Sequence, residues 1–198
     1  NNIGNYLPVA AIQGMAEVDA DTWCMHHPVD FDFVNSKYAA VIIGGAGLFH
    51  RCFDRFWRSF AEHCRLPRII WGVGACFPDG RPHREIASSR ASVQRAAARA
   101  ALINVRDDLT ADLYGFSDTS ITPCPTVHYL ADLTARPADG VATLSKHGGL
   151  ASDDEHRVLA DLLSLSGMNT IQTTNVQSKF RGVDDIINKD YCGSQVVV

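Results

Sequence analysis

The sequence has no long apolar run and no excess of positive charge. Its longest nearly uncharged apolar stretch, residues 39–49, is far shorter than the roughly 20 residues that a membrane-spanning helix requires. The net charge of −4, from 18 Lys and Arg against 22 Asp and Glu, argues against a nucleic-acid partner. Residues 1–11 lack the basic start and apolar core of a secretory signal. We therefore expect no transmembrane segment, and a protein of the cytoplasm that works there or at the inner face of the membrane.

The sequence also lacks the paired cysteines of a zinc site or of a disulfide framework. Its six cysteines are widely spaced and form no Cys-x-x-Cys pair, and several lie in apolar stretches. Reduced thiols of this kind are typical of the core of a cytosolic protein. No cysteine pair or histidine pair has zinc-finger spacing, so we predict no metal site.

What is present is an alternation of short apolar runs with segments of helical pattern. The predicted strands are residues 39–43, 68–71, 102–105, 120–124, 141–145, 169–173 and 195–198. The predicted helices include residues 54–64, 88–102 and 152–167. Strands that are apolar throughout and alternate with helices favour a parallel sheet with helices on both faces. The predicted class is therefore α/β with a Rossmann-like sheet.

The helix that begins after Ser152 has the clearest sequence signals. Ser152 and Glu155 have the spacing of a capping box, and Gly167 supplies a stop. Four residues at helical spacing are expected to form its buried stripe: Val158, Leu159, Leu162 and Leu163.

The stretch "TARPADG", residues 134–140, is the most loop-like part of the chain and predicts a domain boundary. We expect a Rossmann-like domain over residues 1–135 and a partial second Rossmann-like domain over residues 136–198, where the alternation of strand and helix restarts.

Glycine and charged residues follow the predicted strands at the places where open α/β sheets bind ligands. Glycines there let a backbone approach a ligand closely, although a tight turn explains them equally well. "GGAGLF" is not a complete dinucleotide fingerprint, because Phe49 stands where the last glycine is expected, and no Gly-Lys-Ser/Thr loop occurs. The turns concerned are "GGAGLFH" (44–50), "GVGACFP" (72–78), "RDD" (106–108) and "PTVH" (125–128).

Charge at the tip of the third strand has two explanations. Asp107 and Asp108 suit the first turn of a helix, where carboxylates cap free backbone N–H groups. Capping does not explain Arg106, which we expect to face the crevice beyond the strand and to hold a carboxylate or phosphate there. His50 and His128 are weak candidates for catalysis, because lone histidines near apolar runs are more often structural.

Four stretches follow one another in a characteristic order: "AAVIIGGAGLF", "RIIWGVGACFP", "INVRDDLTADLYGF" and "ITPCPTVHYL". Together they resemble the polysaccharide pyruvyl transferase family over about residues 1–133. The most specific piece is "VRDDLTADLYGF", in which a strand ends in Arg-Asp and a helix ends at Gly plus an apolar residue. The opening "NNIGNYL" is similar to the family's Asn-x-Gly-Asp turn, with Asn5 where Asp is usual.

The resemblance implies two Rossmann-like domains in the arrangement of GT-B glycosyltransferases, with the site in the cleft between them. It implies transfer of pyruvate from phosphoenolpyruvate to a sugar or lipid-linked oligosaccharide as a cyclic ketal, in cell-surface or exopolysaccharide biosynthesis, with no cofactor. The first domain then receives the acceptor. The residues expected to line its acceptor side are Gly4, Asn5, Gly44, Gly45, Gly47 and Arg106.

The family's Arg-x-His-Gly motif, implicated in holding phosphoenolpyruvate, does not occur in these 198 residues. "CGSQVVV" resembles the strand that precedes that motif, so we expect the chain to be a fragment or a degenerate member. Two alternatives stay open: a glycosyltransferase that uses a nucleotide sugar on the same scaffold, and a relic that binds sugar without turning it over. A nicotinamide-dependent oxidoreductase is a weaker third, because the glycine fingerprint is incomplete.

Overall fold

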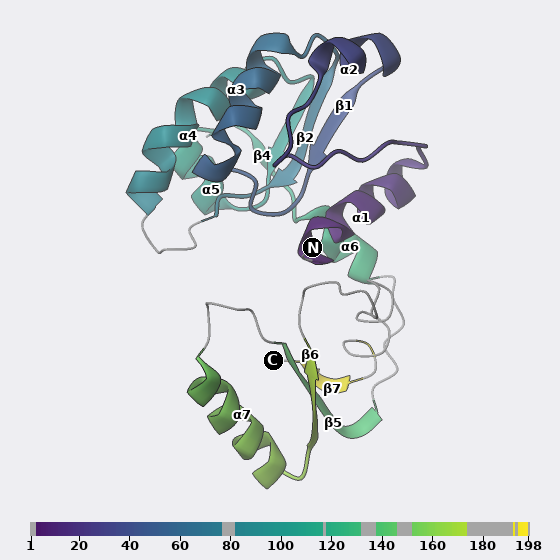
Figure 1. The fold of residues 1–198 in the computed structure, drawn as a ribbon, viewed down its shortest axis with the longest axis vertical. Coiled ribbons are helices and arrows are strands. Elements are labelled where there is room, and N and C mark those ends of the chain that lie inside the picture. The colour runs from purple at the N-terminus through teal and green to yellow at the C-terminus, as the bar shows by residue number, and fades with distance from the viewer. Residues whose placement is uncertain are drawn as a thin grey trace. The chain divides into compact units, whose positions relative to one another are not determined.

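The computed structural model describes residues 3–76, 82–116, 118–131, 138–145, 152–173, 192 and 194–197 (Figure 1). The chain forms two compact units, one of residues 7–129 and one of residues 130–198 together with residues 1–6. Most of the predicted boundary at 134–140 lies outside the described residues, so the boundary and the GT-B-like arrangement stay predictions. Among the helices that the structure describes, none has both the length and the apolarity to cross a bilayer.

In the larger unit, four strands form a parallel sheet whose spatial order follows the chain. Ile43 pairs with Ile70, and Ile70 pairs with Ile103 on the next strand. Every pair is parallel, so each strand requires a crossover before its neighbour. The strands are β1 (Val41–Gly44), β2 (Arg68–Val73), β3 (Leu102–Val105) and β4 (Ser120–Ile121).

The three crossovers are helical, as the alternation in the sequence predicts. They contain α3 (Asp54–His63), α4 (Pro82–Ala97) and α5 (Asp108–Tyr114). Right-handed crossovers that all step in one direction place their helices on one face of the sheet. Figure 1 shows α3, α4 and α5 together beside the sheet.

Further helices cover the other face. Neighbouring residues of a strand point to opposite faces: Ile43 belongs to the core that includes Trp57, whereas Gly44 lies against Ile12. Ile12 belongs to α1 (Leu7–Ala16), and α6 (Pro125–Ala131) begins beside β2. A parallel sheet with helices on both faces confirms the predicted α/β, Rossmann-like class. Two short elements complete this unit, α2 (Phe31–Lys37) before β1 and η2 (Arg51–Phe53) before α3.

The core between the sheet and its three crossover helices is aromatic. Phe49 packs edge-on against Trp57 at 5.4 Å between ring centroids and lies 4.9 Å from the ring of Tyr114. All three side chains are fully buried. Their polar atoms are paired, because the Trp57 indole donates to Leu48 O at 2.9 Å and the Tyr114 hydroxyl meets Ser89 Oγ at 2.7 Å.

One arginine is also buried in this core. Arg68 begins β2 and is 1% exposed, and its Nη2 donates to Ala61 O and Cys64 O at the end of α3. Its guanidinium carbon lies 4.8 Å from the centroid of the Phe60 ring. The last carbonyls of a helix carry partial negative charge and an aromatic face attracts a cation, so both contacts offset the cost of burying this charge.

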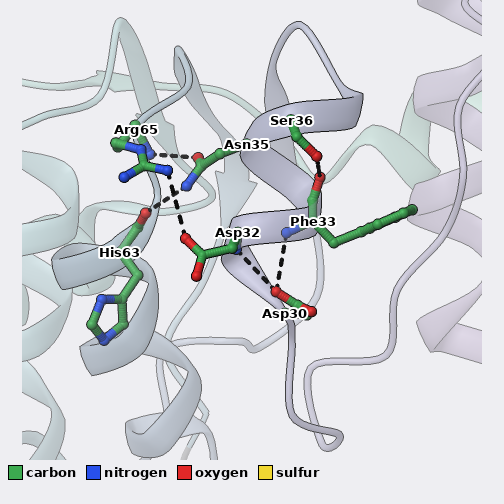
Figure 2. Close-up of polar contacts among 7 residues, drawn as sticks. All are labelled: Asp30, Asp32, Phe33, Asn35, Ser36, His63 and Arg65. Carbon is green, nitrogen blue, oxygen red and sulfur yellow. Dashed lines mark hydrogen bonds and ion pairs between the residues drawn. The ribbon is translucent and has the colours of Figure 1, made fainter.

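Hydrogen bonds connect α2 to the end of α3, at the amino-terminal edge of the sheet (Figure 2). Asp30 caps α2 by accepting the backbone N–H groups of Asp32 and Phe33. Asn35 donates to His63 O and accepts the Arg65 N–H, both at 2.8 Å. One amide side chain therefore joins two helices that are far apart in sequence.

The smaller unit contains η1 (Ile3–Asn5) and a second parallel sheet with strand order β6-β5-β7. Its three strands confirm the three that the sequence predicts after residue 140. They are β5 (Ala138–Ser145), β6 (Asn169–Thr173) and β7 (Ser194–Val197), and α7 (Asp153–Leu165) connects β5 to β6.

The predicted capping box of α7 is confirmed. Ser152 Oγ accepts the Glu155 N–H at 3.2 Å, and Glu155 Oε2 accepts the Ser152 N–H at 2.7 Å. The Ser152 N–H and the Ser152 hydroxyl both donate to Glu155 Oε2, and these two hydrogen bonds hold the pKa of Glu155 below its usual range.

The predicted buried stripe of α7 is wrong, because none of its four residues is fully buried. Val158 is 55% exposed and Leu162 is 56% exposed, while Leu159 and Leu163 are half-buried. A three-stranded sheet offers only a narrow face to a helix. The described residues therefore cover the side of the stripe that contains Leu159 and Leu163 and leave Val158 and Leu162 exposed.

Replacing Ser152 with alanine is expected to destabilise α7 by about 0.5–2 kcal/mol, because the Glu155 N–H loses its partner. Hydrogen exchange of the α7 amides measures the effect, with Ser164→Ala as the control on the exposed surface of the same helix. Equal exchange rates in both variants and the parent would contradict the capping role.

Candidate functional site

Two loops meet at the carboxyl-terminal ends of β1 and β2. Phe49 and Ala75 form a parallel bridge, and the Phe49 N–H donates to Gly74 O at 3.1 Å. The Gly74 N–H donates to Ala46 O at 2.9 Å, so the two loops are linked in both directions. This edge is where the sequence predicts the site.

The glycines of the first loop let other parts of the unit approach closely. A Cβ at Gly44 would overlap Ile12 Cδ1, and one at Gly47 would lie 2.7 Å from Cys76 Cβ. Gly45 has a φ of +65° and would meet Pro8 and Cys124. Packing thus explains why these positions are glycine, and contact of their backbone with an acceptor stays a prediction.

Asp107 is the N-cap of α5, as the sequence predicts. Its Oδ1 accepts the Thr110 N–H at 2.8 Å and the Thr110 hydroxyl at 2.6 Å. Its Oδ2 accepts the Arg106 Nε–H at 2.9 Å. Both carboxylate oxygens are therefore occupied, and the aspartate serves as helix cap and as partner of the arginine at once.

Arg106 reaches from the end of β3 to the loop after β2. Its Nη2 donates to Ala75 O at 3.1 Å, and the guanidinium lies where a side chain at Gly74 would stand. The Ala75 N–H donates to Thr110 Oγ1 at 2.9 Å. The hydrogen bonds among Arg106, Asp107, Thr110 and Ala75 thus form a closed ring, which we call the Arg106 ring.

The ion pair in the Arg106 ring is open to water. The side chains of Arg106 and Asp107 are 36% and 38% exposed. Burial raises the pKa of Asp107, but hydrogen bonds from Thr110 and Arg106 outweigh burial and lower the pKa below its usual range. Among the described residues, Arg106 Nη1 has no hydrogen-bond partner, whereas Nε and Nη2 each have one.

The remaining predicted site residues are Gly4, Asn5, His50 and His128. Gly4 and Asn5 are exposed residues of η1, in the other compact unit. His50 Nδ1 accepts the Cys52 N–H at 3.1 Å and caps η2, and His128 is exposed on α6. No described contact joins either histidine to Arg106.

The sequence places Gly74 and Ala75 in a candidate ligand-binding turn, but it predicts neither these two residues nor Thr110 as members of the site. The second glycine of "GVG" and the spacing Asp-x-x-Thr are present as signals. Neither signal indicates that Arg106 and Thr110 contact Ala75, which lies 31 and 35 residues earlier in the chain.

The described residues contain no group of three or more His, Cys, Asp or Glu that could hold a metal ion. A cavity of about 220 Å³ lies between residues 25–29 and the start of α3, and its lining includes His26, Cys52 and Arg55. None of the predicted site residues lines this cavity.

Gly44→Ala is expected to lower stability by about 1–3 kcal/mol, because its methyl group would overlap Ile12 Cδ1. Adding Ile12→Val removes that atom and should restore part of the loss. Urea unfolding of the single and double variants measures both effects, and additive losses would contradict the packing explanation.

Asp107→Ala is expected to cost about 0.5–2 kcal/mol near neutral pH. Since the folded-state pKa lies below the unfolded value, the stabilisation by the carboxylate is complete above the unfolded pKa. It is lost as the pH falls through the folded pKa. Urea unfolding at about pH 7 and about pH 3 should therefore show a difference from the parent that shrinks in acid. Asp112→Ala, on the exposed side of α5, is the control, and a difference independent of pH would contradict the assignment.

Comparison with known proteins identifies the family to which this site belongs. The family model described as polysaccharide pyruvyl transferase matches residues 2–192, which include the whole larger unit, most of the smaller unit and every residue of the Arg106 ring. No curated protein and no solved structure matches the chain. On the strength of the family match, the chain belongs to the polysaccharide pyruvyl transferase family.

Proposed function

We propose that this transferase moves the enolpyruvyl unit of phosphoenolpyruvate onto two hydroxyl groups of a sugar, as a cyclic ketal. The observation that carries the proposal is Arg106, held half-exposed at the carboxyl-terminal edge of the sheet, whose Nη1 has no hydrogen-bond partner among the described residues. Ligands of open α/β sheets bind at this edge. The family membership supports the reaction class.

The proposed reaction balances without a redox cofactor. The methylene carbon of phosphoenolpyruvate takes a proton, two sugar oxygens each form a bond to the neighbouring carbon, and the bond from that carbon to the phosphate oxygen breaks. The sugar hydroxyls lose two protons in total. One proton equals the one gained by the methylene carbon, which becomes a methyl group, and the other is carried away on the released phosphate. A general acid and base are needed for these transfers. His50 and His128 stay weak candidates for that role.

We assign Arg106 to the acceptor side of the site, where Nη1 donates to a sugar oxygen. The turn Gly44–Gly47 is part of the same edge. Gly4 and Asn5 stay proposed members of the acceptor side. We expect the acceptor to be a sugar or a lipid-linked oligosaccharide of cell-surface or exopolysaccharide biosynthesis, modified in the cytoplasm or at the inner face of the membrane.

Product analysis tests the reaction class. The full chain is incubated with phosphoenolpyruvate and a panel of free and lipid-linked oligosaccharides, and the products are examined for a ketal methyl group by NMR and for released phosphate. Phosphate release that depends on the acceptor supports the proposal. If phosphoenolpyruvate does not react and a nucleotide is released from a nucleotide sugar, the reaction is a glycosyl transfer and the proposal is wrong. Sugar binding without any product would indicate a binding protein.

Arg106→Ala is expected to lower kcat/KM about ten- to a hundredfold, because a hydrogen bond from a charged group to the substrate is lost. Arg95→Ala, an exposed position on α4, is the matched control and should leave the kinetics unchanged. Initial rates, with circular dichroism to verify folding, measure both. Equal kinetics for Arg106→Ala and the control would remove Arg106 from the site.

A further inference from the structure

We infer that Thr110 is a positioning residue for Arg106, and that the arginine so fixed takes an uncharged sugar hydroxyl of the acceptor. The inference rests on the proposed function for the identity of the ligand. The geometry of the Arg106 ring carries the positioning part by itself.

The Thr110 hydroxyl links two parts of the larger unit. It is fully buried, and it accepts the Ala75 N–H at 2.9 Å. A backbone N–H can only donate, so the single hydroxyl proton is free to point to Asp107 Oδ1, at 2.6 Å. The direction of each hydrogen bond around Thr110 is thereby determined.

Thr110 fixes the carboxylate of Asp107. Oδ1 receives the backbone N–H and the hydroxyl of Thr110, and Oδ2 receives Arg106 Nε. A carboxylate held by three donors cannot rotate without breaking one of them. Arg106 Nε therefore donates to a carboxylate oxygen, Asp107 Oδ2, whose position is fixed.

The guanidinium is held in turn on two of its three nitrogens. Nε is bound to Asp107 and Nη2 to Ala75 O, and a guanidinium is planar, so these two bonds fix the direction of Nη1. Gly74 provides the space that the guanidinium occupies, because even a Cβ at this position would overlap it. A donor oriented before binding loses little entropy when a ligand arrives.

The charge balance of the Arg106 ring indicates the ligand. Asp107 is 2.9 Å from the guanidinium and ionised at neutral pH, so the pair carries no net charge. Asp107 would repel a phosphate or carboxylate placed beside Arg106, which offsets much of the attraction by the arginine. An uncharged hydroxyl takes the hydrogen bond from Nη1 without that repulsion. The acceptor sugar fits this site better than phosphoenolpyruvate does.

Thr110→Val removes the hydroxyl and keeps the size of the side chain. We expect the KM for the acceptor to rise about tenfold, with the KM for phosphoenolpyruvate unchanged. Thr110→Ser restores the hydroxyl and should return the acceptor KM to near the parent value. Thr119→Val is the matched control for the same substitution outside the Arg106 ring. An unchanged acceptor KM in Thr110→Val, or a larger rise in the KM for phosphoenolpyruvate, would overturn the inference.

A measurement that needs no activity separates this inference from the proposed function. The Arg106 Nε–H gives a signal in nitrogen NMR, which is assigned by its loss in Arg106→Lys. Its proton should exchange slowly with water in the parent and in Thr110→Ser. In Thr110→Val the proton should exchange faster, so the signal should broaden or vanish. If the parent transfers no pyruvate, the proposed function fails while this signal still decides the positioning role; a signal unaffected by Thr110→Val would overturn that role.

If Thr110→Val does not fold, Gly74→Ala gives a second route. Its methyl group displaces the Arg106 guanidinium and leaves the Thr110 hydroxyl in place. The expected rise in acceptor KM is the same. A folded Gly74→Ala with the parent's KM for the acceptor would show that the direction of Arg106 does not matter, and would overturn the inference.

Discussion

Parallel pairing of β1, β2 and β3 is the interaction on which the rest of the larger unit depends. Parallel strands all end at the same edge, so pairing brings the turns after residues 44, 73 and 105 together although they are far apart in the chain. The consecutive strand order requires three crossovers, which are α3, α4 and α5. The aromatic core and the Arg106 ring both follow from this arrangement.

The strands and the caps were predictable because their causes are local. Apolar, β-branched runs predict strands such as β3, and the spacing of Ser152 and Glu155 predicts a capping box. The N-cap of α5 was predictable for the same reason, since the sequence places Asp107 and Asp108 between a predicted strand and a predicted helix, and Asp107 is the cap. Each of these features depends on residues within a few positions of one another.

The partners of Arg106 were not predictable, because they depend on tertiary contacts. The sequence places an arginine at a strand tip but does not say that Ala75 O accepts one of its N–H groups. It also does not say that Gly44 and Gly45 face α1. The error on Val158 and Leu162 has the same origin, because helical periodicity gives the apolar face without saying how wide a surface covers it.

The two arginines that join the strands to their neighbours differ in the chemistry of their partners. Arg106, near the carboxyl-terminal edge, is paired with a carboxylate that a proton can neutralise. Arg68, at the amino-terminal end of β2, is bound to backbone carbonyls and an aromatic ring, and neither takes a proton in the range in which proteins fold. Acidification therefore acts on the two ends of the sheet unequally. Because the pKa of Asp107 lies below its usual range, the edge that carries the site loosens only in strong acid, where the contacts of Arg68 persist. In strong acid the geometry that orients Arg106 is therefore lost before the contacts that hold Arg68.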